Sequence, residues 1–125
     1  MKILHVGYSD ILGGAAIAMG RLHKAMLSNG INSEALVLKK LNNGLKVTGA
    51  SKNEILFNEI KIKLARQKKY FYKSESHHSH SINLFNSNIL KKIEKIKAEI
   101  VNLHWINNEL ISIKQISKIK APIVW

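Results

Sequence analysis

The spacing of apolar residues changes twice along the opening segment, and each change predicts a new element. Residues 2–7 (KILHVG) form a short apolar run that ends at a glycine, which is typical of a buried strand. Apolar residues then recur at helical spacing over 14–29, and Gly30 follows as a helix-ending residue. Residues 33–40 (SEALVLKK) are again strand-like. The pattern predicts one strand–helix–strand unit of a parallel sheet.

The middle of the chain continues with a turn-rich segment and a second helix. A short edge strand is expected at 46–48. Ser51 suits the N-cap of a helix, because its hydroxyl can accept a hydrogen bond from a free backbone amide. The apolar positions of that helix are Ile55, Leu56, Ile60 and Leu64. Residues 72–83 are polar and poor in helix formers, which indicates a loop.

The last part of the chain alternates helix and strand again. A short helix is expected over 88–97, a strand over 99–105 and a strand over 122–125. Between the two strands, Asn108 could cap a helix over 109–118 whose inward side chains would be Leu110, Ile113 and Ile116. The whole pattern predicts a single α/β domain over 1–125, a Rossmann-like open and mostly parallel sheet with helices on both faces.

Composition narrows the class of protein. The 125 residues are 46% hydrophobic and 22% charged, which is typical of a folded domain, and they contain no cysteine, which excludes disulfides and thiolate metal sites. No signal peptide and no apolar run long enough to cross a membrane is visible, so we expect a cytoplasmic protein, soluble or peripheral on the inner membrane face. Twenty basic against eight acidic residues give a net charge of +12, which favours anionic partners or serves solubility.

A pair of glycines, Gly13 and Gly14, opens the first predicted helix. Ligands of open α/β sheets bind beyond the carboxyl ends of the strands, where this loop lies, and free amides at a helix start suit a diphosphate. The segment has neither the G-x-G-x-x-G spacing of dinucleotide-binding folds nor the Gly-Lys-Ser/Thr of a P-loop. From spacing alone, a diphosphate site and a tight loop-to-helix turn both remain open.

Both ends of the chain resemble one family. Residues 1–38, with GGAA followed by a helix and a small strand, look like the opening of bacterial glycosyltransferases of family 4. Residues 98–125 (AEIVNLHWINNELISIKQISKIKAPIVW) are similar to a later segment of the same enzymes. Residues 42–80 match poorly. The resemblance is specific because two separate segments point to the same family.

The resemblance implies a GT-B fold, in which two Rossmann-like domains face each other across a cleft. This chain would be the acceptor-side N-terminal domain, and the other domain would hold most of a nucleotide-sugar, which is a substrate and not a cofactor. Gly13 and Gly14 would let the backbone approach the sugar-nucleotide diphosphate when the cleft closes. Relatives continue with TLHD where this sequence stops at Trp125. We therefore expect an incomplete domain that is inactive alone, with an open sheet edge that favours self-association.

The resemblance also assigns the residues that follow the strand at 99–105. His104 matches a histidine beside the transferred sugar, and an imidazole there could hold a sugar hydroxyl or help to move a proton. Trp105 and Asn107 could line the same crevice, with Trp105 offering a flat apolar face to a sugar. Asp10 could face the acceptor or stabilise a turn, and the turn is favoured. A strand-end histidine bound only to backbone is the alternative for His104.

Two weaker signals lie in the middle of the chain. Residues 61–73 are basic, with aromatic residues among them, which fits contact with an anionic membrane, a solvated helix end or, less favoured, nucleic acid. His77, His78 and His80 lie close together, but their spacing matches no structural zinc site and only Glu75 could assist them. We expect a surface loop there and no metal.

Together these observations predict part of a hexosyltransferase that moves a sugar from a nucleotide-sugar to a saccharide or lipid-linked acceptor. By family habit the product would belong to a surface polysaccharide. The alternative is a free-standing basic α/β module that binds anionic polymers or a membrane surface without catalysis.

Overall fold

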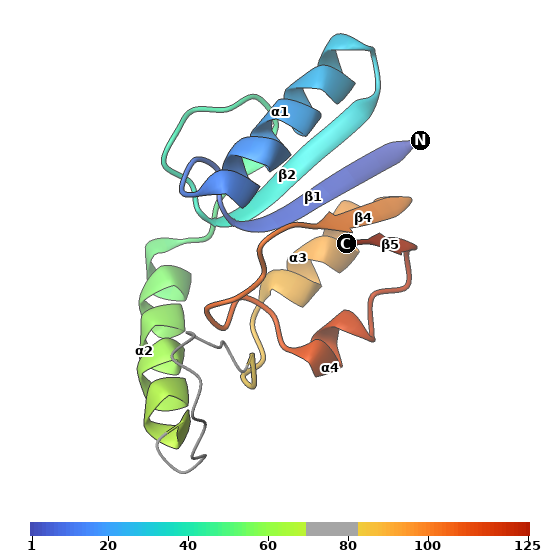
Figure 1. Cartoon of the computed structure of the whole chain (residues 1–125). Helices are drawn as coiled ribbons and strands as arrows, with labels where there is room; N and C mark the ends of the chain where they lie inside the picture. The colour runs from blue at the N-terminus through green and yellow to red at the C-terminus, as the bar shows by residue number, and fades with distance from the viewer. Residues whose placement is uncertain (70–82) are drawn as a thin grey trace.

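Five parallel strands form one open sheet (Figure 1). The structure is a computed structural model, and it describes residues 1–69 and 83–125. The strands are β1 (Lys2–Ser9), β2 (Asn32–Lys39), β3 (Val47–Thr48), β4 (Ile100–Leu103) and β5 (Ile123–Val124). Their order across the sheet is β3-β2-β1-β4-β5, so the chain first builds outward from β1 on one side and then crosses to the other. The predicted α/β class and parallel sheet are confirmed.

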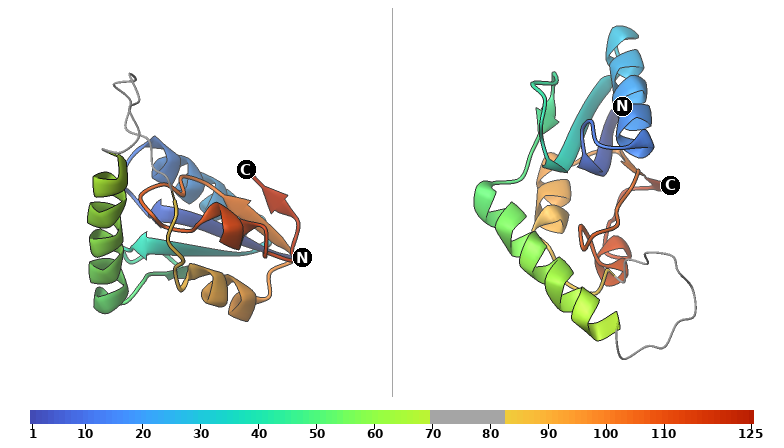
Figure 2. Two further views of the ribbon diagram at one scale, coloured as in Figure 1. Left: turned by 90° about the horizontal axis from the view of Figure 1, so that it is seen from below. Right: turned by 60° about the vertical axis from the view of Figure 1, so that its left-hand side comes forward.

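The helices are α1 (Gly14–Ser28), α2 (Lys52–Lys69), α3 (Ile89–Ile96) and α4 (Ile113–Ile116). Helices α1 and α3 cover opposite faces of the sheet (Figures 1 and 2). Helix α2 stands beyond the carboxyl end of β2 (Figure 2). Helix α2 and the loops that follow β1 and β4 therefore lie at the same end of the sheet, the carboxyl end of its strands.

The two faces of the sheet differ in chemistry. On the α3 face the buried residues form one apolar cluster: Leu4, Val6, Leu36, Leu38, Ile89, Ile93, Val101, Leu103, Ile106, Leu110 and Ile111. Because side chains of a strand alternate between faces, His5 points the other way and meets His23 of α1 with ring centroids 5.8 Å apart. Both histidines are buried, as is Ser33 of β2. The α1 face thus encloses polar groups within an otherwise apolar layer.

Helix α1 ends as the sequence predicts. Asn29 is the C-cap, and Gly30 follows with φ of 73°, a conformation that glycine adopts without strain. The Gly30 amide donates to the Leu27 carbonyl at 3.1 Å, and the Ile31 amide donates to the Met26 carbonyl at 2.9 Å. This pair of bonds is a Schellman motif, which closes the last carbonyls of the helix and turns the chain into β2.

Helix α2 begins where it is expected, but of its apolar positions only Ile55 packs against the apolar cluster. Ser51 and Glu54 form a capping box, in which each side chain accepts from the other residue's backbone amide. The buried side chains of α2 are Asn58, Lys61 and Ala65. By contrast, Leu56, Ile60 and Leu64 are 60%, 46% and 45% exposed. The helix turns a polar strip inward because that strip makes hydrogen bonds to the segment after β4.

The predicted helix over 109–118 is wrong, since only α4 forms. Asn108 and Glu109 have φ of 58° and 56°, which a right-handed helix excludes. Side chains from elsewhere hold this backbone: Asn58 donates to the Asn108 carbonyl, and Lys61 donates to the Glu109 carbonyl at 3.0 Å. Ser112 then caps α4 by accepting from the Gln115 amide. Tertiary hydrogen bonds therefore override the local helical pattern.

Candidate functional site

The loops that follow β1 and β4 lie side by side at the carboxyl ends of these strands. The His104 amide donates to the Val6 carbonyl at 2.9 Å, and the Tyr8 amide donates to the Trp105 carbonyl at 3.1 Å. These bonds continue the pairing of β1 with β4 beyond the last residue of β4. The strand order reverses its direction between β1 and β4, which is where open α/β sheets bind ligands. The predicted residues after β4 therefore lie at the favoured place in this fold.

A small recess opens between these loops and the start of α1. Its volume is about 10 Å³, and it is lined by residues of β1, the β1–α1 loop, α1 and the segment after β4: Gly7, Tyr8, Ser9, Leu12, Ala16, Met19, His104 and Trp105. The Tyr8 and Trp105 rings meet edge to face, with centroids 5.4 Å apart. Trp105 remains 42% exposed, so its indole forms part of the surface beside the recess.

His104 is held from beneath by a second histidine. Its Nε2 lies 3.1 Å from Nδ1 of His5, and the two ring centroids are 5.3 Å apart. Burial lowers the pKa of His104 below its usual value. Burial, followed by the neighbouring His104 and His23, lowers the pKa of His5 to about 4. Both imidazoles are therefore neutral at neutral pH, a form that can accept one hydrogen bond and donate another.

His23 closes the inner end of this histidine cluster. Its Nδ1 lies 2.7 Å from the Ser33 hydroxyl, and its Nε2 lies 2.9 Å from the Leu45 carbonyl. The carbonyl can only accept, so Nε2 of His23 carries a proton and donates it. His23 thereby ties α1 to β2 and to the segment before β3, while its ring packs edge-on against His5.

The two glycines have different conformational roles. Gly13 is the N-cap of α1 with φ of 86° and ψ of 167°, a region in which side chains are strained. Gly14 is the first residue of the helix, and a Cβ built on it would meet nothing within 4 Å. The N-terminus of α1 has no side-chain cap and no acidic residue in its first turn. Gly13 and Gly14 are exposed but do not line the recess, which the helix start reaches through Leu12 and Ala16; the free amides there favour a negatively charged group.

Asp10 joins the glycine loop to the segment after β2. Its Oδ1 accepts from the Leu41 amide at 2.9 Å, and its Oδ2 accepts from the Asn42 amide at 2.8 Å. The turn within the loop is instead stabilised by Ser9, whose hydroxyl accepts from the Ile11 and Leu12 amides. With both oxygens of its carboxylate engaged, Asp10 supports the loop, which is close to the turn role that the sequence favours.

Two other residues complete the comparison with the sequence analysis. Asn107 is half-buried and lies outside the lining of the recess. His5 was not expected in the site, although a histidine inside an apolar strand is unusual enough to mark it. The predicted surface loop with His77, His78 and His80 lies outside the described residues, as does most of the polar segment around it. The described part of the chain holds no group of three or more metal-binding side chains.

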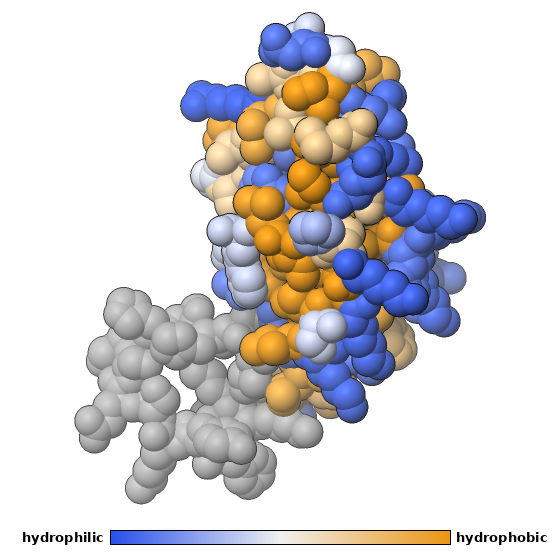
Figure 3. Space-filling view, turned by 90° about the vertical axis from the view of Figure 1, so that its right-hand side faces the viewer, coloured by the Kyte–Doolittle hydropathy of each residue, from blue (hydrophilic) through white to orange (hydrophobic). Residues whose placement is uncertain are grey.

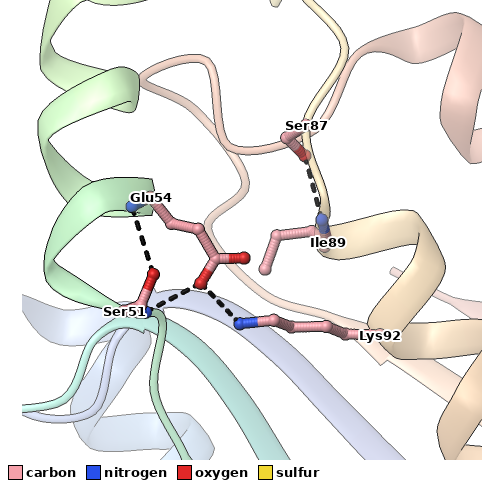
Figure 4. A network of polar contacts seen from close by, with 5 residues as sticks. All are labelled: Ser51, Glu54, Ser87, Ile89 and Lys92. Atoms are coloured by element: carbon pink, nitrogen blue, oxygen red, sulfur yellow. Dashed lines mark hydrogen bonds and ion pairs between the residues drawn. The ribbon is translucent and has the colours of Figure 1, made fainter.

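A larger pocket of about 600 Å³ lies between α2, α3 and the end of β2. Figure 4 shows part of its wall, where Glu54 of α2 binds Lys92 of α3 at 2.8 Å beside Ser87 and Ile89. Burial raises the pKa of Glu54, but the hydrogen bonds from Lys92 and Ser51 outweigh it and the net pKa is lowered. The pocket is also lined by Lys91 and by Lys61, whose pKa is lowered by burial and whose Nζ donates to the Glu109 carbonyl, but it lies away from the reversal point of the sheet. The strand-end recess is the better candidate site.

Comparisons with known proteins leave the fold as the main guide to function. No profile of a protein family matches the chain, and neither characterised proteins nor solved structures gave a match. Within residues 1–69 and 83–125, no helix is both long and apolar enough to span a bilayer. The functional assignment therefore depends on the geometry of the recess and on the sequence resemblance.

Proposed function

We propose that this chain is the acceptor-side domain of a glycosyltransferase that uses a nucleotide-sugar. One observation carries the proposal: the uncapped N-terminal end of α1 and the His104 imidazole flank the same recess at the reversal point of the sheet. An anion-binding helix end next to a neutral imidazole suits a molecule that joins a diphosphate to a hydroxyl-rich ring.

Each group would have a separate role in sugar transfer. The amides at Gly14 and the positive end of α1 would offset the charge that the leaving diphosphate develops. His104 would hold a hydroxyl of the sugar first and assist proton movement second. Trp105 would present its exposed ring to the saccharide. A second domain, as in the GT-B fold that the sequence resembles, would contribute most of the nucleotide contacts.

The test uses the chain joined to the donor-binding domain, in an assay of sugar transfer. His104→Ala should lower kcat by roughly 10²-fold or more, because a positioned imidazole contributes on that scale. Gly14→Val should raise the KM for the nucleotide-sugar, whereas Gly14→Ala should fold normally and show a smaller effect. Lys118→Ala, at an exposed position far along the chain from both groups, serves as the control. Full activity of His104→Ala would contradict the proposal.

A second candidate function is contact with an anionic membrane through α2, which contains residues 61–69 of the basic segment 61–73; residues 70–73 lie outside the described part of the chain. The exposed apolar side chains Leu56, Phe57, Ile60 and Leu64 fall on one face by helical spacing. Along one flank of that face lie Lys52, Lys63 and Arg66, all exposed. Glu59 falls on the same flank by helical spacing, and Lys39 of β2 pairs with it at 3.4 Å. An apolar stripe with a basic flank is the pattern of a helix that lies in the interface of an anionic bilayer.

Vesicle binding tests this candidate. The protein should sediment with vesicles that contain phosphatidylglycerol and much less with pure phosphatidylcholine vesicles. Ile60→Glu should abolish sedimentation, and Lys24→Gln on α1, which also lowers the net charge by one, is the charge-matched control that should retain most of it. Equal binding by Ile60→Glu would contradict a role for α2. Binding to nucleic acid, the less favoured alternative, would instead fall steeply with salt for the wild type and for Ile60→Glu alike.

A further inference from the structure

His5 is a buried imidazole in a strand whose other buried residues are apolar apart from Ser9 at its end. It is fully buried, between Leu4 and Val6 in the chain, and its ring faces α1. Burying a polar ring costs free energy unless the ring gains hydrogen bonds, so its presence calls for a partner. The only hydrogen bond of the His5 side chain within the described residues is the one to His104.

The atoms in that bond decide which nitrogen of His104 is free. Nδ1 of His5 lies 3.1 Å from Nε2 of His104, so Nε2 is occupied from the buried side. Within the described part of the chain, Nδ1 of His104 has no hydrogen-bond partner. The His104 backbone is fixed separately, by its amide bond to the Val6 carbonyl. Backbone and ring are therefore both anchored to β1.

We propose that His5 is a positioning residue that holds the His104 ring through Nε2, so that Nδ1 is the nitrogen that contacts the ligand. The pair shares one proton between the rings, which ties the protonation of His104 to that of a buried neighbour. The inference rests on the proposed function only for the ligand, an oxygen of a sugar. The pairing of the two rings itself stands without it.

His23 is excluded as a further member of this hydrogen-bonded chain. Both of its nitrogens are engaged elsewhere, by Ser33 and by the Leu45 carbonyl. Its ring packs edge-on against His5 and restricts how that ring can turn. His23 and His104 are thus the titratable groups that face His5, and only His104 exchanges a hydrogen bond with it.

Nuclear magnetic resonance of protein with ¹⁵N-labelled histidine tests the pairing directly. We expect a scalar coupling across the hydrogen bond between Nδ1 of His5 and Nε2 of His104. The coupling should vanish in His5→Leu. It should persist in His23→Asn, the matched control, which places an amide where Nδ1 of His23 faces Ser33. A coupling to Nδ1 of His104, or no coupling in a folded wild-type protein, would overturn the proposal.

Kinetics of the two-domain protein separate positioning from simple packing. His5→Leu should lower kcat by roughly 10²-fold with a smaller change in KM, because a shift of about 1 Å at the reacting group costs that much. His5→Asn places an amide where Nδ1 stands, and it should recover most of the loss. Equal losses for both folded variants, or none for His5→Leu, would contradict positioning.

A titration with inorganic pyrophosphate keeps this inference distinct from the proposed function. Pyrophosphate should shift the amide signals of Gly14 and Ala15 at the start of α1, in wild type and in His5→Asn alike. Absence of that shift counts against the diphosphate site and leaves the inter-ring coupling as measured. If His5→Leu does not fold, His5→Gln, whose amide stands away from the Nδ1 position, takes its place in the comparison with His5→Asn.

Discussion

The pair formed by His5 in the middle of β1 and His104 after β4 shows how one buried residue can set the chemistry of a half-buried neighbour. His5 is in the interior and His104 is half-buried at the recess. Burial keeps the pKa of each ring below its usual value. The pair is therefore neutral under ordinary conditions, and a proton enters it only at acidic pH.

The depressed pKa of His5 predicts acid sensitivity of the fold. Its pKa is about 4 in the folded state against 6.5 when unfolded, so the unfolded chain binds more protons between these values. Stability is fully present above pH 6.5 and is lost as pH falls from there toward 4. Urea unfolding at several pH values measures this. His5→Leu should flatten the slope in that window, although His104 retains part of it. An unchanged slope in His5→Leu would contradict the assignment.

The sequence indicated His104 but not His5, for a physical reason. His104 is assigned through the family resemblance of residues 98–125, whereas the only signal for His5 is a histidine within an apolar run, which does not say what that histidine contacts. Its importance arises from the pairing of β1 with β4, which joins residues 99 positions apart. Such a contact becomes visible only once the order of the strands is known.

At the scale of elements, the start of α1 predicts opposite effects for two adjacent glycines. Gly13→Ala places a side chain at φ of 86°, which should cost about 1–3 kcal/mol of the free energy of unfolding. Gly14→Ala meets no neighbour within 4 Å and restricts the unfolded chain, so it should stabilise by about 0.4–1 kcal/mol. Chemical denaturation of both variants is the measurement. Equal effects would show that the loop relaxes around either side chain.

The helices differ in how well their sequence patterns predict them. Helices α1 and α3 form close to their predicted bounds because their apolar faces pack directly on the sheet. Over 109–118 the pattern is helical, but Asn83 also intervenes, by accepting from the Glu109 amide and donating to the Ile106 carbonyl. The spacing of apolar residues within one segment carries no information about hydrogen bonds from residues far away in the chain. Helix α2 presents Asn58 and Lys61 to the interior because these side chains donate to the carbonyls of Asn108 and Glu109.

At the scale of the whole molecule, both edges of the sheet are short strands. β3 and β5 contain two residues each, and β5 exposes Ile123 and Val124 by 38% and 52%. Figure 3 faces the side of the molecule on which β5 lies and shows apolar surface along much of it. An uncovered edge with apolar side chains is a template for pairing with another chain.

The overall α/β order was predictable, because it depends on patterns that alternate over many residues.

The open edge predicts self-association of this chain. Sedimentation velocity at rising protein concentration should show a species heavier than the monomer. Val124→Lys should shift the distribution toward the monomer, because a lysine on an edge strand opposes pairing. Lys118→Ala, at an exposed position a few residues before β5, provides the control. A single monomeric species at every concentration would contradict the prediction.

The carboxylate of Asp10 has a mechanical consequence. It grips the amides of Leu41 and Asn42, while the Asp10 amide itself donates to the Lys39 carbonyl. These hydrogen bonds join the loop after β1 to the segment after β2, some thirty positions further along the chain. A ligand that shifts the loop at Gly13 and Gly14 would therefore also shift the segment after β2. Binding at the start of α1 should change the environment of Leu41.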